Sequence, residues 1–210
     1  MIILIGSEKG GVGKSTLATN FSVYLTLLGK DVILVDSDKQ RTSSNWADDR
    51  RKSNLPIVES VSKYDNIRHT LKDLQKRYEY VIVDAQGRDS IELRTGILSA
   101  NICITPVQPS QADLDTIYKM VNITQTAQET NEELKTYSII SRAPNTSTEI
   151  TEARQCLSNV KEIQLLNHVV YDRRIYRDAL GTGKSVLEME NDKAIRELTL
   201  VCEEIFHENA

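Results

Sequence analysis

Residues 2–16 read Ile2-Ile-Leu-Ile5-Gly6-Ser-Glu-Lys-Gly-Gly-Val-Gly13-Lys14-Ser15-Thr16. Ile2–Ile5 is a short apolar run typical of a strand buried on both faces, and a helical pattern begins at Ser15. The glycines between them let successive backbone N–H groups converge on an anion without obstruction by Cβ atoms. The helix N-terminus adds about half a positive charge and free N–H donors. A strand, a glycine-rich loop and a helix in this order predict a phosphate-binding site.

Two side chains at the end of this loop have predicted roles. Lys14 is placed to reach the β- and γ-phosphates of a nucleotide, and the Ser15 hydroxyl to ligate Mg²⁺. The generic phosphate loop has a glycine five residues before Gly13, where this chain has Glu8. The loop is therefore a variant in which the Gly-Lys-Ser core is intact.

The rest of the chain alternates strand patterns with helical patterns, which predicts an α/β fold. Further runs rich in Ile and Val predict strands at Val32–Val35, Tyr80–Val83, Ile102–Thr105, Tyr137–Ile140 and Leu165–Val170. Apolar residues at helical spacing predict helices over Ser15–Leu28, Asp65–Arg77, a segment opening at Ser110-x-x-Asp113, and Ala194–His207. We expect a three-layer fold, with a mostly parallel sheet covered by helices on both faces, and a single domain over residues 1–210.

Acidic residues follow two of the predicted strands. Asp36 and Asp38 come after Val32–Val35, and Asp84 comes after Tyr80–Val83. Ligands of open parallel sheets bind outside the carboxyl ends of the strands. We therefore expect these carboxylates to lie at the sheet edge that bears the glycine-rich loop.

Composition excludes several classes of protein. The 210 residues contain 26 Lys and Arg against 30 Asp and Glu, so a histone-like basic protein, a disordered acidic tail and a collagen-type repeat are excluded. The apolar runs are far shorter than the roughly 20 residues that span a bilayer, and the N-terminus lacks the basic region of a signal peptide. Three cysteines and three histidines lack metal-ligand spacing, and the odd cysteine count is typical of thiols in a reducing cytoplasm, the expected location.

Lys9-Gly10-Gly11-Val12-Gly13-Lys14-Ser15-Thr16 resembles the deviant Walker A motif, KGGxGK[ST], of the ParA/MinD class of P-loop ATPases. The resemblance implies a P-loop NTPase fold, ATP and Mg²⁺ as cofactors, and nucleotide contacts along the whole of this motif. In that class the extra lysine, here Lys9, crosses a nucleotide-sandwich homodimer and contacts the phosphates of the partner's ATP. A second cation placed in this way stabilises the negative charge that develops on the oxygen bridging the β- and γ-phosphates, as an arginine finger does. Lys9 and Lys14 are thus both expected to be catalytic.

The acidic segments also resemble motifs of this class. Asp36-Ser37-Asp38-Lys39-Gln40 resembles its VDxDPQ segment, with Lys39 where proline is usual. By this resemblance Asp38 orients and polarises the attacking water, Asp36 supports the Mg²⁺ region, and Asp84 is the Walker B aspartate that holds Mg²⁺ through a water molecule. Near the adenine base, the resemblance points to Pro109 and Arg142 as candidate contacts.

Partners follow from the same resemblance. The length is most like that of the small plasmid-partition ParA ATPases, which implies an ATP-dependent homodimer, non-specific DNA association with the nucleoid, and a ParB-like centromere-binding partner. Because the net charge is −4, a DNA-binding face has to be local. The candidates are two basic clusters, one of Arg173, Arg174, Arg177 and Lys184 and the other of Arg50, Arg51 and Lys52. MinD carries a basic C-terminal amphipathic helix that inserts into membranes, whereas this chain ends in an acidic one, so we expect no membrane partner.

Two alternatives to DNA partition remain open. The first is a ParA-like ATPase that positions another cargo, such as conjugative DNA or a protein cluster, since the ATPase core would be the same. The second is a metabolic or assembly P-loop enzyme. Iron-carrier members of that kind need a cysteine pair at the dimer axis, and Cys103, Cys156 and Cys202 show no such pattern.

Overall fold

The computed structural model describes residues 1–207, apart from the side chains of residues 111, 112 and 147. The strands are β1 (Ile2–Ile5), β2 (Val32–Ser37), β3 (Glu59–Ser62), β4 (Tyr80–Ala85), β5 (Ile102–Val107), β6 (Lys135–Ile140) and β7 (Gln164–Leu165). The α-helices are α1 (Lys14–Leu27), α2 (Thr42–Arg51), α3 (Arg68–Gln75), α4 (Ile91–Ile97), α5 (Gln111–Leu114), α6 (Ile117–Gln128), α7 (Ser147–Ser158), α8 (Arg174–Leu180) and α9 (Asp192–His207), and η1 (Val186–Glu188) is a 3₁₀ turn. Within residues 1–207 the strands form one parallel sheet in the order β3-β2-β4-β1-β5-β6-β7.

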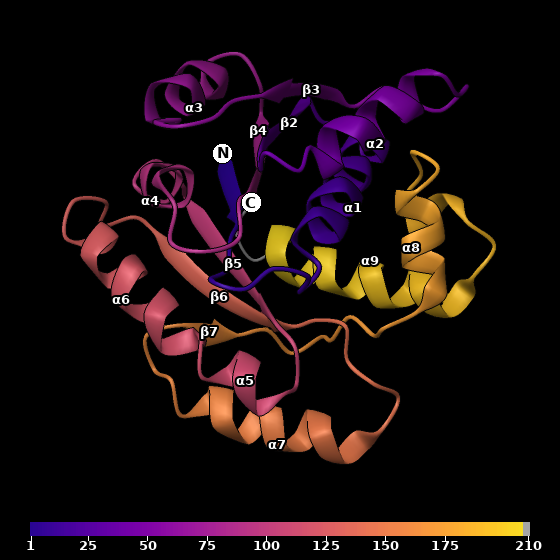
Figure 1. The fold of residues 1–210 in the computed structure, drawn as a ribbon. Coiled ribbons are helices and arrows are strands. Elements are labelled where there is room, and N and C mark those ends of the chain that lie inside the picture. The colour runs from indigo at the N-terminus through magenta and orange to yellow at the C-terminus, as the bar shows by residue number, and fades with distance from the viewer. Residues whose placement is uncertain (208–210) are drawn as a thin grey trace.

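Helices cover both faces of this sheet, as Figure 1 shows. Alternate side chains of the strands point into two separate apolar cores. One core packs against α3, α4, α6 and α7, and the other against α1, α2, α8 and α9. The predicted three-layer α/β architecture is confirmed. None of the helices within residues 1–207 is long and apolar enough to cross a lipid bilayer.

The register of the sheet brings the predicted loop and carboxylates to one edge. β1 lies between β4 and β5, and Ile5 is level with Asp84 of β4. Asp84 is in turn level with Asp36 of β2. From β1, the chain first builds the sheet on the side of β2 and β4, and later on the opposite side with β5, β6 and β7. Ligands of open parallel sheets bind where the strand order reverses in this way.

The strands differ from the prediction in two places. The strand expected over Leu165–Val170 is wrong beyond Leu165, because the backbone N–H groups of Asn167 and His168 donate to the Glu204 carboxylate of α9 instead of continuing the ladder. The edge strand β3 was not predicted. Its Glu-Ser-Val-Ser sequence is half exposed and pairs only with β2, so it lacks the apolar run of a buried strand.

The helix expected after Ser110 is interrupted. The backbone N–H and hydroxyl of Thr116 both donate to the Asp113 carbonyl oxygen, which ends α5 before α6 begins at Ile117. Four further helices, α2, α4, α7 and α8, were not predicted. Their short or largely polar sequences give weak helical periodicity.

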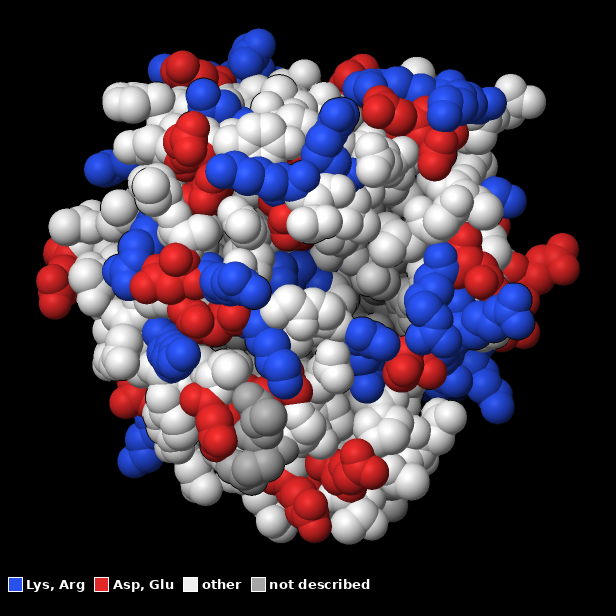
Figure 2. Space-filling view, in the orientation of Figure 1, with Lys and Arg blue, Asp and Glu red and all other residues white. Residues whose placement is uncertain are grey.

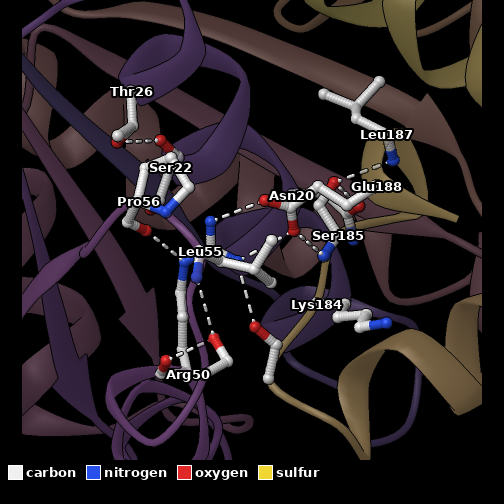
Figure 3. A network of polar contacts seen from close by, with 12 residues as sticks. Asn20, Ser22, Thr26, Arg50, Leu55, Pro56, Lys184, Ser185, Leu187 and Glu188 are labelled. Carbon is white, nitrogen blue, oxygen red and sulfur yellow. Dashed lines mark hydrogen bonds and ion pairs between the residues drawn. The ribbon is translucent and has the colours of Figure 1, made fainter.

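A buried ion pair joins α2 to the segment before α9 (Figure 3). The Arg50 guanidinium donates to both carboxylate oxygens of Glu188, at 2.8 and 2.7 Å, and their side chains are only 1% and 9% exposed. Arg50 also donates to the carbonyl oxygens of Pro56 (2.8 Å) and Gly183 (3.0 Å). A Cβ at Gly183 would lie 2.5 Å from the Arg50 backbone nitrogen, so this close approach requires glycine. The predicted second DNA-binding cluster therefore loses Arg50, which is a structural residue.

We expect Arg50→Ala to lower the free energy of unfolding by about 3–5 kcal/mol, because it leaves the buried Glu188 carboxylate with the Ser185 N–H but no cation, and leaves two carbonyl oxygens without this donor. The neighbouring Arg51 is 41% exposed and pairs with Asp48 at 3.3 Å, so Arg51→Ala should cost at most about 1 kcal/mol. Chemical denaturation of both variants measures the difference. Equal losses would show that the buried pair contributes no more than a surface one.

Candidate functional site

The glycine-rich loop leaves β1 and ends at the start of α1. Gly13 precedes the helix with a φ of 99°, and no side chain caps the helix there. A Cβ at Gly13 would lie 2.8 Å from the Ser141 Oγ, so both the conformation and the space require glycine. The N–H groups of the first turn of α1 are thus left to bind an anion, as the sequence predicts.

A cleft of about 690 Å³ opens at this edge of the sheet. Most of the predicted site residues line it, namely Gly10, Gly11, Gly13, Lys14, Ser15, Thr16, Asp38 and Arg142. Arg177, predicted as a DNA-binding residue, also lines the cleft, and sequence reasoning missed Gln40, Thr42, Gln86, Gly87, Arg88 and Leu180. They come from the loops after β2 and β4 and from α8, which meet only in three dimensions. Val12 and Pro109 do not line the cleft, since the Val12 side chain is buried and Pro109 lies beyond β5.

Lys14 is buried within the loop that it serves. Its ammonium donates to the Lys9 carbonyl oxygen at 3.0 Å and to the Ser7 hydroxyl at 3.3 Å. Burial lowers the pKa of Lys14, and the carboxylates of Asp84 and Asp38 partly oppose this. A cation that has lost water and binds only uncharged oxygens is ready to exchange them for phosphate oxygens.

Lys9 lies at the outer side of the loop, away from the cleft lining. Its ammonium pairs with the Asp113 carboxylate at 2.8 Å, and its side chain is 42% exposed. The contact predicted between Lys9 and the phosphates of a partner's ATP stays a prediction, since a single chain cannot display it.

Asp84 is a buried carboxylate with incomplete hydrogen bonding. Its Oδ2 accepts the Ser43 hydroxyl at 2.7 Å, whereas Oδ1 is buried and has no partner among residues 1–207. Burial raises the pKa of Asp84 to about 6, the Asp36 charge adds to this, and the hydroxyls of Ser15 and Ser43 oppose it. A buried oxygen without a donor, beside the Ser15 hydroxyl, fits a hard divalent cation such as Mg²⁺.

Asp36 and Asp38 have different roles in the same turn. Both carboxylate oxygens of Asp36 accept backbone N–H groups, Oδ1 from Asp38 at 3.0 Å and Oδ2 from Ser44 at 2.7 Å. Asp36 therefore shapes the turn behind the metal region. Asp38 accepts the Gln40 N–H at 2.9 Å and also lines the cleft, where its carboxylate can reach a water molecule.

Arg142 closes the side of the cleft opposite the carboxylates. Its backbone has a φ of 50°, and its guanidinium donates to the Gly11 carbonyl oxygen at 2.6 Å and lies 3.8 Å from Asp172. Arg142 and Ser141 also line a small adjoining pocket of about 40 Å³ with residues of the Val170–Arg177 segment. The contact predicted between Arg142 and the adenine base stays a prediction.

These features define what the site can do. Within residues 1–207, no three His, Cys, Asp or Glu side chains converge on a protein-only metal site. The loop, Lys14 and the buried carboxylates can bind a nucleoside triphosphate. Ser15 and Asp84 would hold Mg²⁺, and the bound ion would supply charge neutralisation for the phosphates. Hydrolysis at such a site needs positioning and charge neutralisation, not a nucleophilic side chain.

The three predicted DNA-binding arginines each pair with a carboxylate. Arg173 binds the buried Glu197 at 2.9 Å, and Arg177 binds Asp172 at 2.7 Å while lining the nucleotide cleft. Arg174 is 86% exposed and lies 3.4 Å from Asp178. Figure 2 shows Lys and Arg side chains gathered over α8, with acidic side chains among them.

A second basic surface adjoins Arg173. A groove of about 380 Å³ runs between α7, the chain before α8, and α9. Its cations include Arg154, Lys193 and Arg196, and no Asp or Glu within residues 1–207 forms an ion pair with these three. The sequence signal for this groove, Lys193 and Arg196 three residues apart on the last helix, was missed because Arg154 joins them only in the fold.

The family model described as the CobQ/CobB/MinD/ParA nucleotide binding domain matches residues 3–186. The chain is 27% identical over 189 residues to "maintenance of carboxysome distribution protein A" of Halothiobacillus neapolitanus, covering 89% of this chain and 87% of that protein. It is 29% identical over 113 residues to ParA of Rhizobium radiobacter, covering 53% and 50%. The ATP complex of a McdA variant from Cyanothece has the same fold, with a TM-score of 0.78 and 15% identity over 97% of this chain and 95% of that one. The chain belongs to the CobQ/CobB/MinD/ParA family of nucleotide-binding domains.

Proposed function

We propose that this protein is a Mg²⁺-dependent ATPase that dimerises on binding ATP, binds DNA without sequence preference, and drives the partition of plasmid or other DNA. A ParB-like centromere-binding protein would stimulate hydrolysis and release the DNA. One observation carries the proposal: a loop with two lysines, Lys9 and Lys14, lies at the sheet edge that also holds Asp36, Asp38 and Asp84.

Within one subunit, each residue would have a separate task. The loop amides and Lys14 bind the phosphates, the Ser15 hydroxyl and Asp84 hold the Mg²⁺ region, and Asp38 orients a water molecule for in-line attack. Asp36 keeps the Asp38 turn in place through its two N–H···O bonds. Arg142, which lines the cleft, contacts the base.

Dimerisation would complete the site. Lys9 is at the rim of the loop and 42% exposed, so its ammonium can reach a second subunit that faces the cleft. A cation supplied from the partner stabilises the charge that develops on the β–γ bridge. Binding of ATP and formation of the dimer would then be one event. Sizing the protein with and without ATP tests this step.

DNA binding would use the basic surface around Arg173. Two exposed arginines flank it without serving the nucleotide cleft, Arg174 on α8 and Arg196 on α9. In an ATP-bound dimer this surface is present twice, and contacts to phosphates depend strongly on salt. Contacts of this kind carry no sequence information.

We expect the double variant Arg174→Ala/Arg196→Ala to bind random duplex DNA about tenfold more weakly in the presence of ATP. Its dependence of log affinity on log salt should be less steep by about 4, because four phosphate contacts are lost, two in each subunit of the dimer. The matched control is Lys72→Ala/Lys76→Ala, at the end of α3 and just after it, which removes two exposed charges elsewhere and should bind as the wild type does. Equal binding by both double variants in a fluorescence anisotropy titration would place the DNA surface elsewhere.

A second candidate function is the positioning of a protein assembly. It is favoured by the carboxysome distribution relative, whose similarity extends over 89% of the chain. Both functions use the same ATPase and DNA-binding steps, and they differ in the partner. A stimulating partner that binds a specific DNA site would indicate partition, whereas one that binds a protein cluster would indicate positioning. Gene neighbourhood gives the first indication, since a small DNA-binding protein encoded next door favours partition.

A further inference from the structure

The chain that follows β5 contacts the outer side of the glycine-rich loop at three points. The Gln108 side-chain amide donates to the Gly11 carbonyl oxygen at 3.0 Å. The Lys9 ammonium donates to the Asp113 Oδ2 at 2.8 Å. Lys119 of α6 lies 3.9 Å from the Glu8 carboxylate, too far for a hydrogen bond. The Lys9–Asp113 pair is therefore the strongest of the three contacts.

Asp113 depends on Lys9 for its charge compensation. The Asp113 side chain is 4% exposed, and Lys9 is its one cationic partner among residues 1–207. The Ser110 hydroxyl also donates to Oδ2, while Oδ1 is buried without a partner in the same part of the chain. Withdrawal of Lys9 would leave a buried carboxylate with a single hydroxyl donor, which is unfavourable.

The position of Asp113 is fixed by the backbone. It lies in α5, just before the interruption that separates α5 from α6, and its carbonyl oxygen accepts both the N–H (3.0 Å) and the hydroxyl (2.6 Å) of Thr116. These bonds hold the backbone of Asp113, and its carboxylate faces the loop, where it contacts Lys9 and Ser110.

The Lys9 ammonium has three N–H donors, but its contact with the buried Asp113 directs it into its own subunit, and reaching phosphates bound in a partner would draw it away from that carboxylate. We infer that Asp113 holds Lys9 inside its own subunit, and that release from this contact sets the ATP concentration at which the protein dimerises. This inference rests on the proposed role of Lys9 in the dimer. Only subunits whose Lys9 is released can form the complete site, so the apparent affinity for the dimer is reduced by the fraction that is released.

The structure also supplies a route by which ATP can promote the release. The Lys14 ammonium is bound to the carbonyl oxygen of Lys9 itself, at 3.0 Å. Phosphates entering the cleft would draw Lys14 away from that carbonyl and leave it with one donor, the Ser7 hydroxyl at 2.7 Å. ATP bound in a subunit would thereby weaken the hold on its Lys9 before a partner arrives.

The test measures mass by light scattering while AMPPNP and Mg²⁺ are titrated, since a slowly hydrolysed nucleotide separates assembly from turnover. Asp113→Asn keeps the shape of the side chain and removes its charge. It should reach half-maximal dimer at an AMPPNP concentration about three- to tenfold lower than the wild type. Asp113→Ala should shift in the same direction, and Asp113→Glu, which keeps the charge, should shift less. Lys119→Ala, which removes the long contact of the same chain segment, should match the wild type.

An unchanged midpoint in Asp113→Asn would overturn the inference, and so would a higher one, because Asp113 would then assist the dimer instead of opposing it. Asp113→Ala provides the same comparison if the Asn variant folds poorly, with folding checked by thermal unfolding. Failure of the proposed function gives a different result: the wild type itself would stay monomeric at saturating AMPPNP, or Lys9→Ala would dimerise normally. If the wild type dimerises on AMPPNP, Lys9→Ala does not, and Asp113→Asn has the wild-type midpoint, then only the role inferred for Asp113 is refuted.

Discussion

Lys14→Ala is expected to lower ATP binding and hydrolysis together, with kcat/KM reduced by about 10²–10³-fold or more. Lys14 is the cation that faces the phosphate position inside the cleft, and burial has already removed most of its water. Alanine would leave the loop amides as donors but remove the positive charge that compensates the triphosphate. Titration with a fluorescent ATP analogue and a phosphate-release assay measure both effects.

The control for this variant is Lys39→Ala. Lys39 is an exposed lysine in the neighbouring turn, does not line the cleft, and should leave both quantities close to wild-type values. Turnover by Lys14→Ala at the wild-type rate would contradict the assignment of the loop as the ATP site.

Asp38→Ala is expected to separate binding from hydrolysis. Asp38 contacts the cleft but donates nothing to the phosphate cradle, so ATP should still bind while kcat falls by about 10²–10³-fold. Because hydrolysis would normally dissolve the dimer, an ATP-bound dimer should accumulate. Light scattering after addition of ATP and Mg²⁺ detects it, alongside single-turnover hydrolysis.

Asp48→Ala provides the comparison, since Asp48 is an exposed carboxylate of the following helix α2, with a side chain that is 53% exposed. A monomeric Asp38→Ala protein in the presence of ATP, or one that hydrolyses ATP at the wild-type rate, would remove Asp38 from the water-positioning role.

Local signals explain why so much of the site could be predicted. The strand Ile2–Ile5, the glycines and the first turn of α1 are contiguous, and each has a conformational requirement that its residues show directly. The carboxylates Asp36 and Asp84 follow buried strands, and parallel strands bring such residues to one edge. Elements with an apolar stripe or run were therefore found, and elements without one were missed.

Helix α2 illustrates what sequence alone could not show. Its residues are mostly polar, and it is held in place by Trp46 and Arg50, whose partners Lys184 and Glu188 lie 138 residues further along the chain. An arginine in a polar segment is usually exposed, so Arg50 was grouped with Arg51 and Lys52 as a basic cluster. Its burial depends on a carboxylate that no local pattern connects with it.

The sequence also did not predict which residues contact the site residues. Lys9 and Asp113 are 104 residues apart, and Ser43 and Asp84 are 41 apart. The sequence predicts most of the residues of the glycine-rich loop that line the cleft, since their pattern is local. It does not predict which residue holds each of them at rest, since that depends on how the loops after β2, β4 and β5 meet.

The central claim is that ATP makes a dimer through Lys9. Light scattering of the wild type and Lys9→Ala, each with ADP and with ATP and Mg²⁺, tests it most directly. The account predicts a dimer in one of the four samples, the wild type with ATP, and monomers in the other three. A wild type whose mass does not depend on the nucleotide, or a Lys9→Ala protein that dimerises with ATP as the wild type does, would contradict it.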